Sequence, residues 1–382
     1  MSNAYIGRRS AIWLWKETTA WTKVSPQVRI PKESGTLSPS FETAQDTSWY
    51  GVIDEVFDTF TTKNFSNITL TWIVRDDFIG YLLLGALWKY TKLYCVTWTP
   101  SGWTPARWDI TTGWAELKKI LVIGSTTYYF FDKATSWSTT NGTWTMTATA
   151  VSWVYAHLFE RLNSNNHPTF SMYDDDPVSS SYATYMMINS FELSCEVADY
   201  VKFSAEFQWK QLQNNNTTLN PAYADENPFT ASMAWVLFAN DEAWLNTATA
   251  VCMQNFRLTI NKNLTDIQCF GSTDVSSLHN QQFTLEWDFE ALFEDTTLRD
   301  YVINSDKKAL RFFAENKQAT ALATWIYPSI YVDCMKVWLT EWTKSDDNNG
   351  IVKQTLWFSW QYDNASGTSI EVLLLNGNST WY

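Results

Sequence analysis

The three histidines are the residues best suited to acid–base or metal chemistry near neutral pH. His157, His167 and His279 lie far apart in the sequence, and no H-x-x-x-H or H-E-x-x-H pattern occurs. His167 precedes Pro168 and a strand-like run, which favours a histidine that forms a loop or core hydrogen bond over a metal ligand. We therefore expect no catalytic or metal site built on histidine.

Runs of acidic residues are the second possible source of chemistry, because carboxylates bind hard cations. Residues 174–176 (DDD) lack the spaced D-x-[DN]-x-[DN]-G pattern, so a solvated loop before Pro177 is the favoured interpretation. Residues 346–350 (DDNNG) are typical of a turn-rich hairpin connection. No P-loop, G-x-G-x-x-G or G-x-S-x-G pattern occurs, and no pair of carboxylates is marked as acid and base. The sequence predicts a protein that is not an enzyme and uses no cofactor or metal.

The five cysteines predict neither a disulfide framework nor a zinc site. They are scattered, odd in number and never form a C-x-x-C pair: Cys95, Cys195, Cys252, Cys269 and Cys334. We expect four or five of them to be free, buried thiols.

The net charge of −13 argues against a nucleic-acid-binding groove, which needs a basic face. An acidic surface instead keeps a protein soluble and repels DNA. No stretch approaches the roughly 18–20 apolar residues of a membrane span. The N-terminal residues contain a basic pair but no apolar core or cleavage site of a signal peptide. We expect a protein made in the cytosol that does not associate with a membrane.

Alternation of apolar and polar residues dominates the chain and predicts a mainly β fold. Two segments, 76–87 and 294–303, instead predict helices, each with acidic residues near its start that suit the helix dipole. The predicted strands lie at residues 118–123, 126–131, 143–150, 187–195, 201–208, 256–260, 283–289, 329–339, 354–360 and 369–374.

The two predicted helices belong to an internal repeat. In the first half, residues 37–41 lead through an acidic loop to 64–74 and then to the helix; in the second, 256–264 lead to 281–292 and then to the helix. In each half further strands follow and end in a pair joined by a polar loop. The last strands of the halves read alike, VKFSAEFQWKQ from Val201 and VKQTLWFSWQY from Val352. An ancestral duplication is the simplest explanation, with the polar stretch QNNNTTLN and two prolines as the linker. We predict a first domain at 1–212, a linker at 213–228 and a second domain at 229–382.

Tryptophan is unusually abundant, with 23 residues against only 13 glycines. Average glycine usage of about 7% predicts about 27 glycines in a chain of this length. Trp49, Trp103, Trp114 and Trp137 lie among Ser, Thr, Pro and Gly, in loop contexts that favour a residue with positive φ. Local and overall signals usually agree in natural sequences, so this many conflicts need one cause.

Our hypothesis is that the source organism reads UGA as glycine, whereas the sequence is written with tryptophan at those codons. Trp144 and Trp342 lie in strand-like contexts and fit genuine tryptophans. The alternative is a real tryptophan-rich surface, as in carbohydrate-binding modules whose indoles stack on sugar rings.

With glycine at the doubtful positions, the N-terminal region reads AIGLGKETTAGTKVSP. As written, residues 11–24 (AIWLWKETTAWTKV) resemble the opening of phage tail tube (major tail) proteins. That family begins with a G-x-G-K-E-x-x-x-G-T run, followed by an extended segment and a hairpin. Further resemblances follow in order along the chain: NHPTFSM at 166–172, NSFELS at 189–194 with 201–209, and NFRLTINKNL at 255–264. The resemblance spans residues 11 to 360 and rests on the order of these motifs.

The resemblance implies two tandem tail-tube-like β-sandwich or barrel domains, each with one flanking short α-helix. Such domains pair strands around a ring, which removes exposed sheet edges. Six domains complete a ring, so three copies of a two-domain chain would form a pseudo-hexamer; six copies form the alternative geometry. Rings stack head to tail into a tube. The expected partners are other copies of the chain and tail proteins such as the tape measure and tail terminator.

The function implied is a structural virion protein of the phage tail, assembled in the host cytoplasm. Genomic DNA would pass through the lumen without specific binding, because an acidic wall offers no phosphate clamps. Residues 10–32 and the loops 42–55 and 98–112 are candidates for contacts between rings. The candidate assembly segment comprises Trp13, Trp15, Lys16, Glu17, Thr18, Thr19, Trp21 and Thr22.

Two other functions fit parts of the sequence. A tryptophan-rich, all-β carbohydrate-binding or host-adhesion protein would carry its indoles on one exposed face and bind glycans. The tube of a contractile injection system unrelated to a virion would share the fold. Electron microscopy of the purified protein separates the first of these from a tail tube, because only a tube protein forms rings or filaments.

Overall fold

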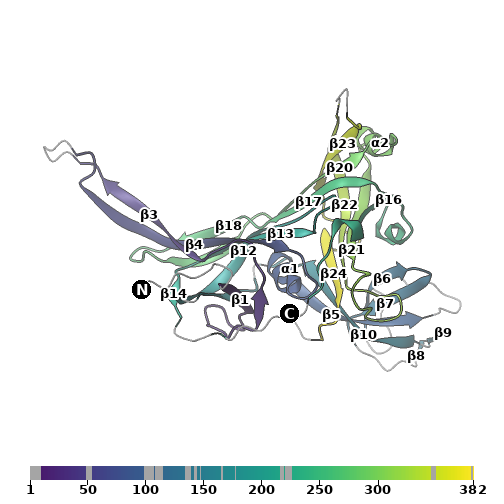
Figure 1. Cartoon of the computed structure of the whole chain (residues 1–382), viewed down its shortest axis with the longest axis horizontal. Coiled ribbons are helices and arrows are strands. Elements are labelled where there is room, and N and C mark those ends of the chain that lie inside the picture. Colours follow the sequence, from purple (N-terminus) through teal and green to yellow (C-terminus); the bar gives the residue numbers. More distant parts are fainter. Residues whose placement is uncertain are drawn as a thin grey trace.

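The fold, a computed structural model, is built almost entirely of antiparallel strands (Figure 1). Twenty of the described strands join in one sheet, and two further pairs stand apart. A mainly β fold with two short α-helices confirms the predicted fold class. The structure describes residues 10–48, 54–98, 107, 115–133, 139–141, 144–146, 148–164, 167–176, 178–215, 219, 226–345, 350–379 and 382.

The elements of the first half run from the N-terminus to the predicted linker. They are β1 (Ala11–Lys16), β2 (Val28–Ile30), β3 (Ser38–Asp46), β4 (Asp58–Ile73), α1 (Ile79–Leu87), β5 (Trp88–Trp98), β6 (Leu117–Ile123), β7 (Thr126–Phe131), β8 (Thr139–Asn141), β9 (Trp144–Met146), β10 (Ala148–Arg161), β11 (Phe170–Asp175), β12 (Ser180–Glu196), β13 (Lys202–Trp209) and β14 (Gln213–Asn214).

The elements of the second half follow. They are the 3-10 helix η2 (Ala231–Met233), β15 (Ala234–Ala239), the 3-10 helix η3 (Glu242–Asn246), β16 (Ala250–Val251), β17 (Met253–Asn261), β18 (Leu264–Gln268), β19 (Val275–Asn280), β20 (Thr284–Leu292), α2 (Thr297–Ile303), β21 (Lys307–Glu315), β22 (Ser329–Lys344), β23 (Lys353–Trp360) and β24 (Ile370–Asn376).

The predicted strands coincide with observed ones, apart from residues 143–150, which fall on both β9 and β10. The alternation that predicted them reflects burial, since every second side chain of β13 is buried. Both helices exist but begin three residues later than predicted. Asp76 is not in the first turn of α1, because its carboxylate instead accepts hydrogen bonds from the backbone N–H (2.7 Å) and side-chain amide (2.8 Å) of Asn227.

The predicted loop 42–55 is wrong over its first residues, because 42–46 belong to strand β3. Most side chains of β3 are exposed on both faces, so the strand has no apolar alternation that a sequence pattern could reveal. Residues 49–53 lie outside the described residues.

Both halves of the chain lay down the same elements in the same order. The series β1, β2, β3, β4, α1, β11, β12, β13 matches β15, β16, β17, β20, α2, β21, β22, β23. Each strand also has the same antiparallel neighbours within its series. The repeat inferred from a few segments therefore extends over whole folding units, and an ancestral duplication remains our explanation of it.

The repeat includes local irregularities of the strands. The β12–β13 ladder shifts register at Asn189, next to the pair Ile188–Phe207. The β22–β23 ladder shifts at Thr340, next to the pair Leu339–Phe358. A bulge at the same position of both ladders fixes which residues of the two halves correspond.

Strands β5 to β10 are an insertion in the first half, with no counterpart between α2 and β21 among the described residues. The last of them, β10, pairs with β24, and β24 also pairs with β22. The boundaries 1–212 and 229–382 therefore remain a prediction. Of the predicted linker, Gln213 and Asn214 form β14, and most of the residues that follow lie outside the described residues.

Helix α1 lies in the middle of the molecule (Figure 1), and all nine of its residues are buried. It packs against β12, β10, β5 and β24, which explains its uniformly apolar sequence IGYLLLGAL. Gly85 is required by this packing, since a Cβ atom there would lie 2.6 Å from Ile188 Cδ1. Among the residues described, no helix combines the length and apolar character that a membrane crossing needs.

Candidate functional site

The candidate assembly segment near the N-terminus is divided between the core and the surface. Trp13 is buried in β1, which pairs with β11 on one side and β2 on the other. Trp15 is partly buried, and its ring centroid lies 5.3 Å from that of Tyr81 in α1. Lys16 ends the strand in a half-buried position. The first part of the segment therefore holds the fold together.

The Glu17 carboxylate is buried and accepts four hydrogen bonds. Two come from the backbone N–H groups of Trp21 (3.1 Å) and Tyr185 (2.9 Å). The others come from the hydroxyls of Thr169 (2.7 Å) and Ser171 (2.9 Å). An ionised carboxylate offers about four acceptor sites, so this one is fully used inside the protein. Glu17 thus anchors the turn that follows β1 to β11 and β12.

The turn itself, Thr18 to Thr22, is the exposed part of the segment. Its backbone closes through a hydrogen bond from Thr22 N–H to the Thr19 carbonyl (3.1 Å). The Trp21 ring stacks on Tyr185 with centroids 3.6 Å apart and 6° between planes. Thr18, Thr19, Trp21 and Thr22 are the members of the candidate segment that a neighbouring molecule can reach.

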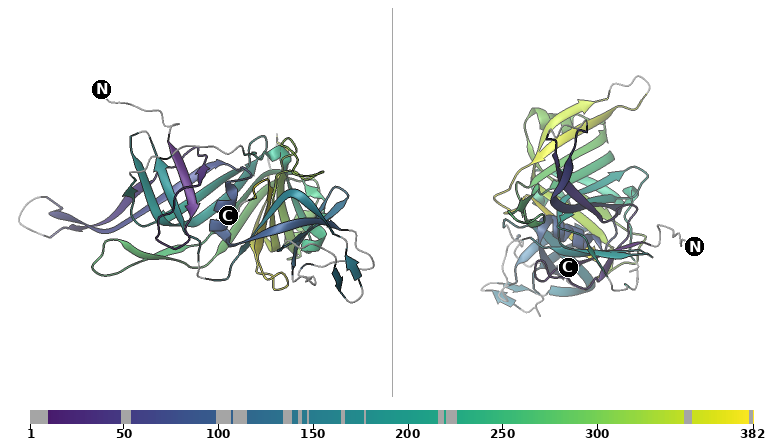
Figure 2. Two further views of the ribbon diagram at one scale, coloured as in Figure 1. Left: turned by 90° about the horizontal axis from the view of Figure 1, so that it is seen from below. Right: turned by 90° about the vertical axis from the view of Figure 1, so that its left-hand side faces the viewer.

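A long arm, formed by β3 and the outer part of β4, projects from the body of the molecule (Figures 1 and 2). Phe41, Phe57 and Phe60 are all exposed on it. A two-stranded hairpin is marginally stable in water on its own, and exposed aromatic side chains favour association. The arm is therefore suited to contact another molecule.

The hairpin β18–β19 projects to the same side and is fastened to the base of the arm (Figure 1). The Asn64 N–H donates to the Thr273 carbonyl at 2.7 Å, and Gln268 Nε2 donates to the Thr62 carbonyl at 2.7 Å. Ile267 and Phe270 are exposed on the hairpin. The other candidate loop, 98–112, lies outside the described residues apart from positions 98 and 107.

The three histidines are each hydrogen-bonded to a neighbouring side chain. His157 is buried between the Tyr90 hydroxyl (2.9 Å) and Asn376 Oδ1 (3.0 Å), and burial lowers its pKa to about 4. His167 bonds to Asn280, and burial likewise lowers its pKa to about 4. The exposed His279 bonds to the Ser277 hydroxyl at 2.9 Å.

The aspartates 174–176 are not the solvated loop that the sequence suggested. Asp174 and Asp175 belong to β11, and only Asp176 starts a turn, where it accepts the N–H groups of Val178 and Ser179, both at 2.8 Å. Asp174 is buried, 3.7 Å from Lys32 Nζ. The predicted loop is wrong because Asp174 contacts Lys32 and Leu37, which are distant in the sequence, and no local pattern indicates such contacts. Residues 346–349, the tip of the hairpin between β22 and β23, lie outside the described residues.

A buried group of charges between β6, β22, β24 and η3 is the one cluster with metal-ligand geometry among the described residues. Oxygen atoms of Glu242, Asp333 and Glu371 all lie within 4.8 Å of one another. The Lys119 ammonium occupies the space between them, 2.6 Å from Glu242 and in contact with Asp333 and Glu371. A resident cation therefore takes the place that a metal ion would need.

Two arginines complete this network and balance its charge. Arg311 forms a two-pronged pair with Asp333, at 2.6 and 2.9 Å, and Arg107 binds Glu242 and Glu371. The surrounding cations hold the pKa of Asp333 well below its usual range, and the carboxylates raise the pKa of Lys119, each against the opposing effect of burial. Three basic side chains paired with three acidic ones make an internal cross-link rather than a reactive site.

Sequence patterns could not find this cluster. Lys119 comes from the first half, whereas Glu242, Asp333 and Glu371 come from three elements of the second half. No fixed sequence spacing links such residues. The one indication in the sequence is the alternation of β6, which places Lys119 on the same buried face as Leu117 and Leu121.

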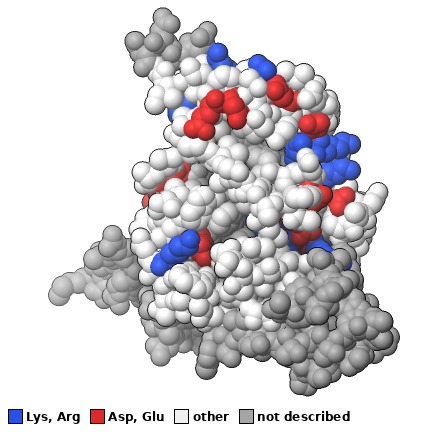
Figure 3. Space-filling view, turned by 90° about the vertical axis from the view of Figure 1, so that its right-hand side faces the viewer, with Lys and Arg blue, Asp and Glu red and all other residues white. Residues whose placement is uncertain are grey.

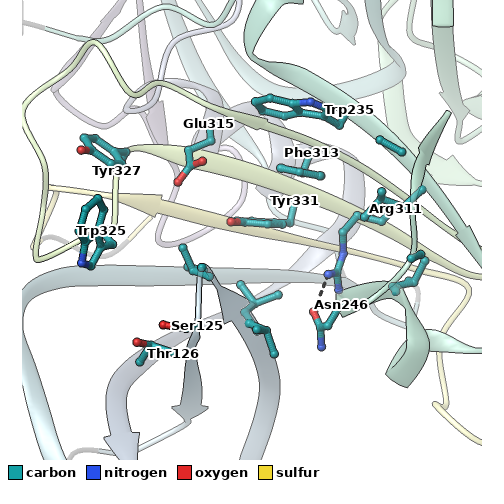
Figure 4. A pocket seen from close by; sticks show the side chains of 18 of the residues that line it. Ser125, Thr126, Trp235, Asn246, Arg311, Phe313, Glu315, Trp325, Tyr327 and Tyr331 are labelled. Carbon is teal, nitrogen blue, oxygen red and sulfur yellow. Dashed lines mark hydrogen bonds between the residues drawn. The ribbon is translucent and has the colours of Figure 1, made fainter. Parts of the chain in front are cut away.

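A pocket of about 780 Å³ opens beside this cluster, between the β6–β7 turn and strands β15 and β21 (Figure 4). Trp235, Phe313 and Tyr331 stack on one another across adjacent strands, with centroids 5.0 and 5.5 Å apart. The middle ring, Phe313, is thus covered on both faces, whereas Trp235 and Tyr331 are each covered on one face by this stack. Arg311 in the wall is held by Asn246 and Asp333. The geometry gives no reactive constellation in this pocket.

The cysteines are all free, but two of the five are exposed. Cys95, Cys195 and Cys334 are buried, whereas Cys252 and Cys269 lie at the surface. The expectation of four or five buried thiols is therefore wrong, because Cys252 falls just before β17 and Cys269 at the tip of the β18–β19 hairpin.

A family model described as "Phage tail tube protein" matches residues 7–324. The match takes in β1, the arm, both α-helices and the junction between the halves. A search of curated proteins finds no match.

Proposed function

From its membership of the phage tail tube protein family, to which this chain belongs, we propose that three copies close into a ring and that stacked rings form the conduit for genome delivery. Membership makes the chain a structural component of the virion tail that assembles with itself into a tube. The number of copies, the ring and the passage of DNA are our proposal.

The observation that carries the proposal is the junction between the two halves. Residues 190–196 of β12 pair antiparallel with 255–261 of β17, so the first half binds the second through backbone hydrogen bonds. Each half has the same strand series, and the same contact can therefore recur between copies. A contact between unlike surfaces that repeats by rotation closes into a ring.

Three copies of a duplicated chain supply six similar units, which favours a pseudo-hexameric ring over a ring of six chains. Closure of the sheet around the ring removes the edges that would otherwise aggregate. In each copy the arm then projects from the first half and the hairpin β18–β19 from the second half, and both are suited to contact the next ring in the stack. The exposed turn at Thr18–Thr22 is a second candidate for that contact.

Passage of DNA needs a wall that does not hold phosphates. The chain has a net charge of −13, and on the face shown in Figure 3 the basic side chains lie in small groups beside acidic ones. The described part of that face carries no broad basic patch (Figure 3). Such a surface offers little counterion release to a DNA backbone, which supports passage without specific binding.

Assembly of the tube in the host cytoplasm, with tape measure and terminator proteins as further partners, belongs to the same proposal. It involves no chemical step: His157 and His167 are bonded to asparagine side chains, and the carboxylates of the Lys119 cluster are paired with cations. The geometry of the residues that the structure describes gives no support to a function as an enzyme.

Electron microscopy of the purified protein tests the proposal. We expect rings with six similar lobes, or filaments of stacked rings, at high protein concentration. Monomers at every concentration, together with binding to immobilised glycans, would instead support the carbohydrate-binding alternative.

A further inference from the structure

One edge of the second half lacks the strand that covers its counterpart in the first half. In the first half, β17 covers the edge of β12 opposite β13. In the second half, β23 pairs with one edge of β22 over residues 337–344. On the other edge of β22, the pairing with β21 ends at Trp338. Among the described residues no strand pairs with the second edge from Glu341 to Lys344.

The register of the strands identifies the matching residues. The shared bulge makes 341–343 of β22 correspond to 190–192 of β12. The other partner in the proposed contact is β3, which corresponds to β17. Asn67 of β4 and Glu286 of β20 hold the same position opposite β13 and β23. Ser38 pairs with Asn67 and Thr259 with Glu286, so residues 38–40 correspond to 259–261. The edge of β3 that faces away from β4 is likewise unpaired by any described strand.

We propose that β22 of one copy pairs antiparallel with β3 of the next, with Glu341 opposite Ser40 and Thr343 opposite Ser38. Within one chain, Ser190 pairs with Asn261 and Glu192 with Thr259. The proposed register repeats these two pairs between copies, with the corresponding residues of β22 and β3. The inference rests on the proposed ring and names the surface and register through which it closes.

The two edges cannot meet within one chain. β3 leaves the body on the side of the arm, whereas the end of β22 lies beside α2 on the opposite side (Figure 1). Edges placed in this way favour head-to-tail contact with a second copy.

A groove beside the free edge has room for an incoming strand. It has a volume of about 430 Å³ and lies between α2 and residues 340–343, with Val302, Ile303 and Trp342 in its lining. In the first half the matching place is filled by Lys262, which follows β17 and reaches the end of α1. The counterpart of Lys262 in β3 is Phe41, 56% exposed, and Ile303 at the end of α2 is 68% exposed. Pairing in the proposed register brings these two apolar side chains to the same end of the groove.

Pro39 shapes the same edge. It falls opposite Trp342 and has no N–H to donate, so this contact has one hydrogen bond fewer than the β12–β17 junction. Proline on an edge strand also discourages pairing with unrelated strands. The Leu37 N–H is already bonded to Asp174 Oδ2 at 3.3 Å, so the contact is centred on residues 38–41.

Cysteine pairs test the register directly. The Lys262 N–H donates to the Asn189 carbonyl (2.8 Å), so in an antiparallel ladder the next pair, Ser190 with Asn261, is a close, non-hydrogen-bonded one. We would mix chains that carry Ser40→Cys with chains that carry Glu341→Cys, and Ser38→Cys with Thr343→Cys. The control recombines the same four substitutions into the shifted pairs 40 with 343 and 38 with 341.

The experiment uses full-length protein in which the exposed Cys252 and Cys269 are changed to serine. We expect rings by electron microscopy and in-register cross-links at least about fivefold above the shifted pairs, because diagonal distances of roughly 7–8 Å exceed the disulfide range. Rings with equal or greater cross-linking of the shifted pairs would overturn the register but keep the ring. Absence of rings in the uncross-linked protein would overturn the proposed function and this inference with it.

A second, independent observation concerns the tryptophans. Among the described residues, three of the seven non-glycine residues with positive φ are tryptophans: Trp21 (71°), Trp88 (76°) and Trp325 (66°). A bulky residue rarely adopts the left-handed conformation, whereas glycine adopts it freely.

Two of these positions carry a further mark of glycine. Trp88 ends α1, where its N–H donates to the Leu84 carbonyl, and a left-handed residue at this place is most often glycine. Trp21 is the third glycine position of the G-x-G-K-E-x-x-x-G-T run. The four loop tryptophans that first suggested a recoded codon, at 49, 103, 114 and 137, lie outside the described residues, so the backbone supports the hypothesis at other positions.

We infer that Trp21, Trp88 and Trp325 are glycines in the native protein, encoded by UGA. Mass spectrometry of tryptic peptides from native particles tests this, with peptides 17–23, 76–89 and 318–336 covering the three positions. We expect each peptide at the mass of its glycine form. Tryptophan masses in these peptides would overturn the inference.

Discussion

The Lys262 ammonium donates a hydrogen bond to the backbone carbonyl of Gly85 across 2.9 Å, in the interior of the protein. Gly85 lies in the last turn of α1, whose carbonyl groups lack partners within the helix. A cation at this end also suits the helix dipole. A residue of the second half therefore caps the helix of the first half, which ties the two halves together beyond their strand pairing.

Lys262→Met should change how stability depends on pH. Burial lowers the pKa of Lys262 to about 7, while the unfolded lysine keeps its proton up to about 10.5. Between these values the unfolded state binds more protons, so Lys262 makes stability rise with pH by up to ~1.4 kcal/mol per unit. We expect the free energy of unfolding of Lys262→Met, measured in urea from pH 6 to 10, to lack this rise. The exposed Lys317→Met serves as the control, and equal slopes in both variants would contradict the assignment.

Lys119→Met should destabilise the protein strongly. The substitution leaves Glu242, Asp333 and Glu371 without the cation between them, and removal of one partner of a buried network costs about 3–5 kcal/mol. Lys202→Met breaks the exposed pair with Asp199, which water screens, and should cost far less stability. Urea unfolding of both variants measures the difference. Similar losses would mean that the buried cluster does not act as a cross-link.

Substitutions in the N-terminal segment should separate folding from assembly. Glu17→Ala removes the acceptor of four hydrogen bonds and leaves buried donors, such as the Tyr185 N–H and the Thr169 hydroxyl, without a partner. It should therefore lower the free energy of unfolding by about 1–3 kcal/mol. Thr19→Arg, in the exposed turn, should change stability by less than about 0.5 kcal/mol. If the turn contacts the next ring, Thr19→Arg should still form single rings but not long tubes. Normal tubes from this variant, seen by electron microscopy, would exclude the turn as that contact.

Trp325→Gly should stabilise protein made with tryptophan at that position. Trp325 is 69% exposed with φ of 66°, and a side chain in the left-handed region costs about 1–2 kcal/mol. Trp244, also exposed, lies in η3 without positive φ, so Trp244→Gly should lower stability by about 0.5–1 kcal/mol. Thermal unfolding of the two variants should therefore shift in opposite directions, and shifts of the same sign would argue against backbone strain at 325.

The amino-acid sequence by itself determined what depends on local pattern and on the order of motifs. Alternation predicted ten of the twenty strands of the sheet, because burial of one face imposes a period on the chain. The predicted helix 76–87 corresponds to α1, which begins three residues later. The resemblance of VKFSAEFQWKQ and VKQTLWFSWQY revealed the duplication, and the N-terminal run with the later motifs indicated the family that the family match confirms.

Only the tertiary structure decided which residues meet. The exposed strand β3 has no buried face and so no pattern, yet it becomes the edge that we propose joins neighbouring copies. Lys119 and its three carboxylates, like Lys262 and Gly85, are brought together by strand pairing between the halves, and no sequence spacing records such contacts. Local sequence sets the type of each element through burial, but long-range pairing sets which charges are neutralised and which edges stay open.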